Sequence, residues 1–129
     1  MKNEEKNLLQ RVITRAVIGC AVEVINELGS GFLESVYEKA MLLALHQKGI
    51  SAVPQMPVTV WFRGVSVGEF YTDILVEKEV MVELRAVNEI TPIHETQIIN
   101  FLKATGIEVG LLINFGTPKL QYKRYTRRK

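Results

Sequence analysis

The sequence contains one cysteine, one aspartate and one tryptophan, and only 4 prolines among 129 residues. A single cysteine excludes an intramolecular disulfide framework and any zinc or iron–sulfur site built from several cysteines. Cys20 lies in an apolar helical pattern, which predicts a small core residue. No apolar run approaches the roughly 18 residues that span a bilayer, and the acidic start is not typical of a secretory signal. We therefore expect a cytoplasmic protein with no membrane partner.

Positive charge is concentrated at the C-terminal end of the chain. At 47% hydrophobic and 23% charged residues, the composition predicts one globular domain over residues 1–129. Of the 16 basic residues, six lie in residues 117–129, which contain no acidic residue. Residues 1–116 therefore contain ten basic and 14 acidic residues, which gives this part of the chain a net charge of −4. We call these six the basic arm. We expect the basic arm to contact nucleic acid; alternatively, it is a solubilising tail. Its residues are Lys119, Lys123, Arg124, Arg127, Arg128 and Lys129.

Hydrophobic periodicity predicts two helices, and a helix start signal predicts a third. Apolar residues recur every three to four positions over residues 4–28, and again over 33–45. Each pattern is followed by a glycine, which is typical of a helix end. Thr91 followed by Pro92 predicts the start of a third helix that runs to residue 105.

Five segments rich in β-branched or aromatic residues are predicted strands. Residues 58–62, 70–76 and 80–87 indicate an antiparallel meander. The continuous apolar run 109–115 is typical of a buried central strand, and 120–125 of an edge strand. The expected order is ααβββαββ, a mixed α/β fold whose mixed sheet is flanked by helices.

The lone aspartate is the most informative residue, because a carboxylate inside an apolar strand needs a charge partner or a cation. A three-residue loop at 77–79 predicts that Ile74 pairs with Val82, and the same register places Asp73 opposite Glu83. Facing carboxylates repel each other unless a cation lies between them. A divalent cation such as Mg²⁺ would remove the conflict; alternatively, Arg85 neutralises the pair in a structural salt-bridge cluster.

Several motifs in order resemble one family over about residues 8–125. Residues 31–37 fit the Gly-x-x-Glu-x-x-Tyr pattern of the GxxExxY proteins, a branch of the PD-(D/E)XK nuclease superfamily. Further matches are Tyr71-Thr72-Asp73, residues 82–87 where the family has Glu-Leu-Lys-Ala, residues 91–103, and residues 110–116. The resemblance implies a restriction-endonuclease-like core. It also implies that Asp73 and Glu83 bind Mg²⁺ or Mn²⁺.

The resemblance further implies that Glu34 completes or borders the metal site and that Gln97 lines the cleft. It predicts a metal-dependent hydrolase of nucleic acid, with DNA as the expected substrate. A domain this small would need a second copy to cut both strands of a duplex, so a homodimer is expected.

The sequence departs from the family at Arg85, where active members normally carry lysine. Arginine does not accept a proton at physiological pH. Either the metal alone activates water while Arg85 stabilises charge on the phosphate, or the site has lost catalysis and the protein is a nucleic-acid-binding or assembly module. His94 is a second candidate base, although a histidine in a first helical turn is more often a hydrogen-bonding residue. Trp61 and Phe62 are expected in the core or on the sheet surface rather than in a base-stacking platform.

Overall fold

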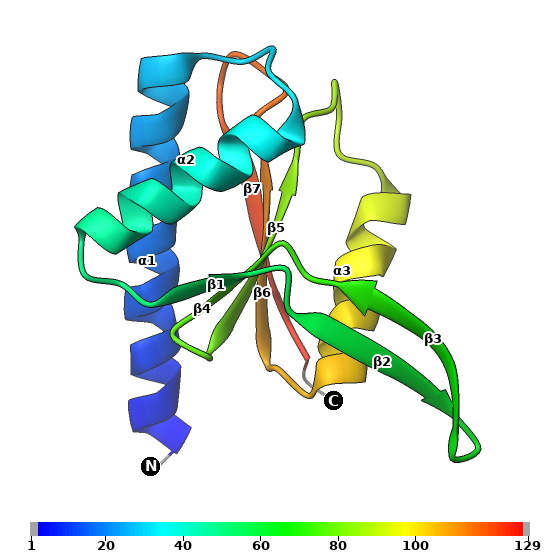
Figure 1. Cartoon of the computed structure of the whole chain (residues 1–129). Helices are drawn as coiled ribbons and strands as arrows, with labels where there is room; N and C mark the ends of the chain where they lie inside the picture. The colour runs from blue at the N-terminus through cyan, green and yellow to red at the C-terminus, as the bar shows by residue number, and fades with distance from the viewer. Residues whose placement is uncertain (1–2, 128–129) are drawn as a thin grey trace.

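The structure, a computed structural model, describes residues 3–127. Three helices and seven strands follow one another along these residues (Figure 1). The helices are α1 (Asn3–Leu28), α2 (Glu34–Gln47) and α3 (Pro92–Thr105). The strands are β1 (Ala52–Pro54), β2 (Pro57–Phe62), β3 (Val65–Tyr71), β4 (Ile74–Val76), β5 (Val80–Arg85), β6 (Val109–Asn114) and β7 (Gln121–Thr126).

The central sheet has five strands in the order β1-β4-β5-β6-β7. Strands β5 and β6 are parallel, and α3 provides the crossover between them; the other neighbours are antiparallel. Strands β2 and β3 form a separate antiparallel hairpin that projects away from the sheet beside α3 (Figure 1). The mixed α/β fold with a mixed sheet flanked by helices is therefore confirmed.

Helices α1 and α2 cover one face of the sheet, and α3 covers the other (Figure 1). The main core lies under α1 and α2, where alternate residues of β5, Val80, Val82 and Leu84, are at most 1% exposed. Cys20 belongs to this core, as predicted, and its burial raises the pKa of the thiol. On the other face, Gly110 gives α3 its close approach, because a Cβ there would lie 3.0 Å from the side chain of Ile98.

The predicted order of elements is wrong at two points, both near Asp73. Segment 70–76 is not one strand: β3 ends at Tyr71 and pairs back with β2, and β4 starts at Ile74 in the central sheet. The amide of Thr72 still donates to the carbonyl of Met56 on the hairpin side. Asp73 uses its carboxylate, not its backbone, to accept the amide of Leu84. The chain therefore changes sheets at residues 72–73.

The second difference is β1, a three-residue edge strand that the sequence did not predict. It pairs with β4, and its last residue is Pro54. Three residues are too few to show an alternating pattern, and proline is confined to edge positions. The register prediction for the next pair is confirmed, because Ile74 faces Val82 and Val76 faces Val80. Within residues 3–127, no helix is long and apolar enough to cross a membrane.

Candidate active site around Asp73 and Glu83

The two carboxylates predicted to face each other are neighbours in the structure. Asp73 directly precedes β4, and Glu83 lies near the end of β5. The amide nitrogen of Asp73 lies 3.3 Å from Oε1 of Glu83, and Oδ2 of Asp73 accepts the amide of Leu84 at 2.7 Å. Each carboxylate thus contacts the backbone of the opposite strand. The pairing of Ile74 with Val82 determines this arrangement.

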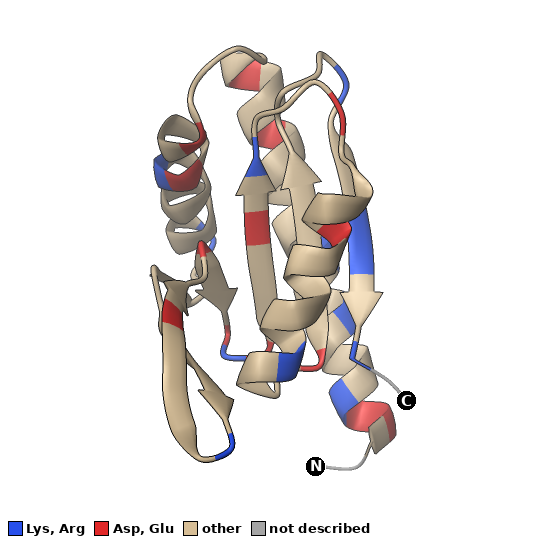
Figure 2. Ribbon diagram, turned by 90° about the vertical axis from the view of Figure 1, so that its right-hand side faces the viewer, with Lys and Arg blue, Asp and Glu red and all other residues tan. Residues whose placement is uncertain are grey.

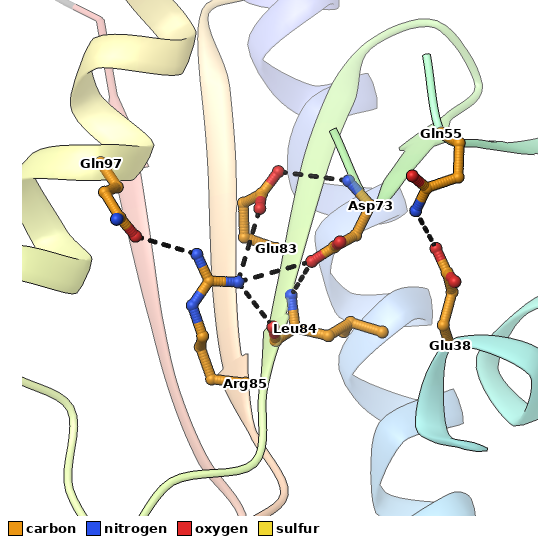
Figure 3. Close-up of polar contacts among 7 residues, drawn as sticks. All are labelled: Glu38, Gln55, Asp73, Glu83, Leu84, Arg85 and Gln97. Carbon is orange, nitrogen blue, oxygen red and sulfur yellow. Dashed lines mark hydrogen bonds and ion pairs between the residues drawn. The ribbon is translucent and has the colours of Figure 1, made fainter. Parts of the chain in front are cut away.

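Arg85 connects the pair to α3 (Figure 3). Its Nη1 lies 3.6 Å from Oδ2 of Asp73 and 3.7 Å from Oε2 of Glu83, and donates to the carbonyl of Leu84 at 2.7 Å. Its Nη2 donates to Oε1 of Gln97 at 3.0 Å. The guanidinium therefore has four partners: the two carboxylates, the carbonyl of Leu84 on β5 and the side chain of Gln97 on α3. The family resemblance implied that Gln97 lines the cleft, and in the structure Gln97 is hydrogen-bonded to Arg85.

Burial makes the two carboxyl groups electrostatically unequal. Glu83 is 2% exposed, and burial together with the nearby Asp73 charge raises its pKa to about 8, although Arg85 opposes the shift. At neutral pH Glu83 is therefore mostly protonated.

The donor set fits a hard divalent cation in part. Two carboxylates within reach of one cation are a common magnesium arrangement, with water and phosphate as the remaining ligands. Within residues 3–127, however, no three histidine, cysteine, aspartate or glutamate side chains form a group that could hold a metal ion. Glu34 lies in the exposed first turn of α2 and remains a predicted third ligand. Binding a cation at Asp73 and Glu83 would require Glu83 to lose its proton.

Glu38 lies on α2 one turn after Glu34. In the structure it is half-buried, and its Oε1 accepts Nε2 of Gln55 at 2.7 Å. The backbone amide of Gln55 in turn donates to the carbonyl of Asp73 at 3.0 Å. Glu38 is thus linked to the Asp73 loop through one residue (Figure 3). Its spacing of four from Glu34, which places both on one helix face, was the available signal.

The tyrosine of the Gly-x-x-Glu-x-x-Tyr pattern is structural. Tyr37 is fully buried and stacks on Phe115 with ring centroids 4.6 Å apart. Its hydroxyl donates to the carbonyl of Gly29 at 2.6 Å and accepts the amide of Phe32 at 3.2 Å. The ring therefore fixes the loop between α1 and α2. This loop determines where the helix carrying Glu34 begins.

Asn114 is a structural residue that sequence reasoning did not single out. It is fully buried at the end of β6, where its side chain bonds both backbone groups of Val87, at 2.9 and 3.0 Å. It also bonds the amide of Gly116 and Oε1 of Gln121, each at 3.0 Å. Gly116 is required here, because a Cβ would lie 2.2 Å from the carbonyl oxygen of Val87. A polar residue inside the apolar run 109–115 was the signal.

His94 caps α3 and is poorly suited to act as a base. Its Nδ1 lies 3.0 Å from the amide of Thr91 and accepts that hydrogen bond. The side chain thereby satisfies one of the free amides at the start of the helix. The alternative of a hydrogen-bonding histidine is the one that this geometry supports.

The basic arm is divided between two faces of the sheet because side chains alternate along β7. On the α3 face, Lys123 forms an ion pair with Glu95 at 2.9 Å, and the Tyr125 hydroxyl donates to the same carboxylate. These bonds lower the pKa of Glu95. Lys119 lies exposed in the loop before β7.

On the opposite face, Arg124 and Tyr122 meet two arginines of α1. Together with Arg11 and Arg15 they line a groove of about 350 Å³, which we call the arginine groove. Figure 2 shows basic residues on β7 and on the N-terminal part of α1 at the same side of the molecule. Arg11 and Arg15 are four apart on one helix, where like charges repel and favour an anion between them.

The end of the basic arm is described only in part. The backbone amide of Arg127 donates to the carbonyl of Glu108 at 2.7 Å, which extends the edge of β7 by one residue. Arg128 and Lys129, also predicted to contact nucleic acid, lie outside the described residues.

Two solved structures resemble this fold. The crystal structure of SSO0001 superimposes with a TM-score of 0.56 at 14% identity, covering 74% of this chain and 50% of that one. An alkaline exonuclease, LHK-Exo from Laribacter hongkongensis, gives a TM-score of 0.54 at 13% identity, covering 73% of this chain and 56% of that one. The chain thus spans about half the length of the solved structures it matches. At such identities the likeness shows the fold, a restriction-endonuclease-like core.

No curated protein sequence matches this chain significantly. The sequence pattern of the PD-(D/E)XK nuclease superfamily does match it, over residues 11–125. This match covers both carboxylates, Arg85, Gln97 and all of the central sheet except Thr126. The chain therefore belongs to the PD-(D/E)XK nuclease superfamily.

Proposed function

We propose that this protein is a metal-dependent phosphodiester hydrolase acting on nucleic acid, and that it is of the GxxExxY type within its superfamily. The observation that carries the proposal is the contact between Asp73 and the buried Glu83, with Arg85 beside both. Burying a second carboxyl group beside a first is costly for folding. A site that binds a cation gives that cost a functional reason.

In this proposal Asp73 and Glu83 hold Mg²⁺ or Mn²⁺, and Glu34 approaches from α2 as a third carboxylate. A bound cation would supply positive charge at the scissile phosphate and lower the pKa of an attacking water. Glu38 holds the Asp73 loop through Gln55.

Arg85 takes the position of the usual lysine but performs only part of its role. It stays charged at all relevant pH values, so it stabilises negative charge on the phosphate and does not accept a proton. Gln97 positions it, because Oε1 of Gln97 accepts Nη2 of the guanidinium. The attacking water would therefore depend on the cation for its activation.

A second candidate function is a nucleic-acid-binding or assembly module that no longer cleaves. Nη1 of Arg85 lies within 4 Å of both carboxylates, the region that a shared cation would occupy. A tethered guanidinium there neutralises the pair without a metal. This contact is the observation that favours the second candidate, because the pair can remain in the fold without a bound cation.

A cleavage assay separates the two candidates. Labelled single-stranded and duplex oligonucleotides and a plasmid are incubated with the full chain and Mg²⁺ or Mn²⁺. The hydrolase proposal predicts cleavage by wild type, loss in Asp73→Asn, and no loss in the matched control Glu69→Gln, which changes an exposed carboxylate. Cleavage that is gained only in Arg85→Lys supports the binding module. No cleavage by wild type or Arg85→Lys with either metal contradicts the hydrolase proposal.

We also propose that residues 1–129 act as one domain, that DNA is the substrate and that two copies associate on a duplex. One active site cuts one strand, so a double-strand cut needs two sites at once. Light scattering with size-exclusion chromatography, with and without duplex DNA, tests this part. A particle of one chain mass under both conditions contradicts it.

A further inference from the structure

A groove of about 600 Å³ lies between the β2–β3 hairpin and α3, and neither proposed role above uses it. Its volume is typical of a small-molecule site. We call it the aromatic groove, and its principal lining residues are Trp61, Phe70, Asn100, Phe101, Lys103 and Ala104.

The tryptophan of this groove lies exposed on the surface of the β2–β3 hairpin, not in the core. Trp61 is 66% exposed, whereas Phe70 and Phe101 stack on each other at a centroid distance of 4.2 Å and form part of the wall. A register shift between Val60 and Trp61 interrupts the alternation of β2. A large indole left in solvent beside an aromatic wall is a surface suited to a flat, apolar ligand.

The groove and the candidate active site are close to each other along α3 and along the chain. Gln97, Phe101 and Ala104 are spaced four and three apart and so share one face of α3. Gln97, which contacts Arg85, therefore lies about 6 Å along the helix axis from Phe101. On the other wall, Phe70 precedes Asp73 by only three residues. A chain bound at Arg85 can extend directly into the groove.

The polar residues of the groove indicate which kind of ligand it can bind. Lys103 lines it, Asn100 adds an amide, and the residues that line it include no acidic side chain among those described. These features match the parts of a nucleotide. The aromatic rings can stack on its base, the amide of Asn100 can bond the polar edge of the base, and Lys103 can pair with its phosphate.

On the basis of the proposed function, we propose that the aromatic groove binds an unpaired base of single-stranded nucleic acid next to the scissile phosphate. The base stacks on Trp61, the amide of Asn100 contacts its polar edge, and Lys103 contacts the adjoining phosphate. Stacking tolerates all bases, so the groove confers a preference for single strands rather than for a sequence.

Trp61 is the only tryptophan and reports directly on this binding. Metal-free full-length protein in EDTA is titrated with a short oligodeoxythymidine, and then with an abasic oligonucleotide of equal length and charge. We expect saturable quenching of the indole emission by the first and little change with the second. Because no metal or cleavage is needed, this result is independent of whether the protein is a hydrolase.

Variants locate the site by the anisotropy of a labelled oligonucleotide. Trp61→Ala should weaken binding roughly 5- to 100-fold, the usual effect of losing one stacked base, and Trp61→Phe should restore most of it. The matched control is Phe62→Ala, because Phe62 is the neighbouring aromatic, is 57% exposed and does not line the groove. Circular dichroism should be unchanged in all three variants, since each affected ring is exposed.

Three outcomes overturn the proposal. One is equal quenching by the abasic strand, which would mean that only phosphates are bound. Another is an equal loss of affinity in Phe62→Ala and Trp61→Ala. The third is an indole emission that depends on protein concentration and not on oligonucleotide, which would identify the hairpin as a contact between two copies of the chain. Quenching without any cleavage, in contrast, supports the groove and contradicts only the hydrolase.

Discussion

The backbone amide of Asp73 lies 3.3 Å from Oε1 of Glu83, while the carboxylate of Asp73 accepts the amide of Leu84, next to Glu83. The two candidate ligands thus also complete the strand pairing where β4 begins. Substitutions that preserve shape, asparagine and glutamine, are therefore preferable to alanine, which would leave backbone amides unpaired.

Stability should fall with rising pH because of Glu83. Its pKa is about 8 in the folded protein and near 4.5 when unperturbed, so the folded state binds more protons between these values. The free energy of unfolding then decreases from about pH 4.5 to 8, by at most about 1.4 kcal/mol per unit, and Glu83 contributes no further slope above this range. Urea denaturation of Glu83→Gln at pH 5 to 9 should show a flatter profile and higher stability at pH 8. An unchanged slope contradicts the assignment.

Removing the guanidinium should destabilise the pair. Arg85→Met leaves Asp73 without its cation, at an expected cost of about 3 kcal/mol, typical of one buried partner lost. The Arg85→Met/Glu83→Gln double variant should lose less than the sum of the two single variants, because the residues are in contact. Thermal unfolding measures both effects. An Arg85→Met variant as stable as wild type would show that the contacts contribute nothing.

Asn114 should be among the most sensitive positions outside the site. Asn114→Leu removes four hydrogen bonds from a fully buried position and leaves both backbone groups of Val87 unpaired. We expect a loss of about 3 kcal/mol in urea denaturation. The control Gln121→Ala removes only one of these bonds and should cost under about 1 kcal/mol. Equal effects would contradict the assigned role.

Binding to nucleic acid should depend on the arginine groove more than on Lys123. Replacing Arg11 and Arg15 by glutamine should lower the slope of log affinity against log salt by about two units if both contact phosphates. Lys123→Gln should have a smaller effect, because Glu95 already pairs with this lysine. Truncation after Thr126 removes three charges of the basic arm and should weaken binding to all sequences alike. Salt titrations of oligonucleotide affinity test this, and slopes equal to wild type contradict it.

The sequence predicted what local patterns determine. Apolar spacing located α1 and α2, and the Thr91-Pro92 start signal located α3. The short loop at 77–79 fixed the register of β4 on β5, from which the contact of Asp73 with Glu83 follows. Arg85 and Gln97 were assigned to one site, and they meet there.

The rest depends on tertiary contacts that no local pattern contains. The change of sheets at residues 72–73 is accompanied by a side-chain hydrogen bond of Asp73 to the amide of Leu84. This contact is with another strand, and segment 70–76 alone therefore looked like one strand. The division of the basic arm depends on which helix lies over each face of β7. The sequence left Trp61 between the core and the sheet surface, because its register shift and the projecting hairpin cannot be read from its neighbours in sequence.

The most direct test of the metal proposal is calorimetric titration of Mn²⁺ or Mg²⁺ into the full chain at pH 6.5 and pH 8.5, with Asp73→Asn as the matched variant. If the cation binds ionised Glu83, whose pKa is about 8, it must displace a proton. Affinity should then rise roughly 20-fold between the two pH values, with about one proton released at the lower pH, and Asp73→Asn should abolish binding. Equal affinity at both pH values, or binding that survives in Asp73→Asn, would contradict a metal site at this pair.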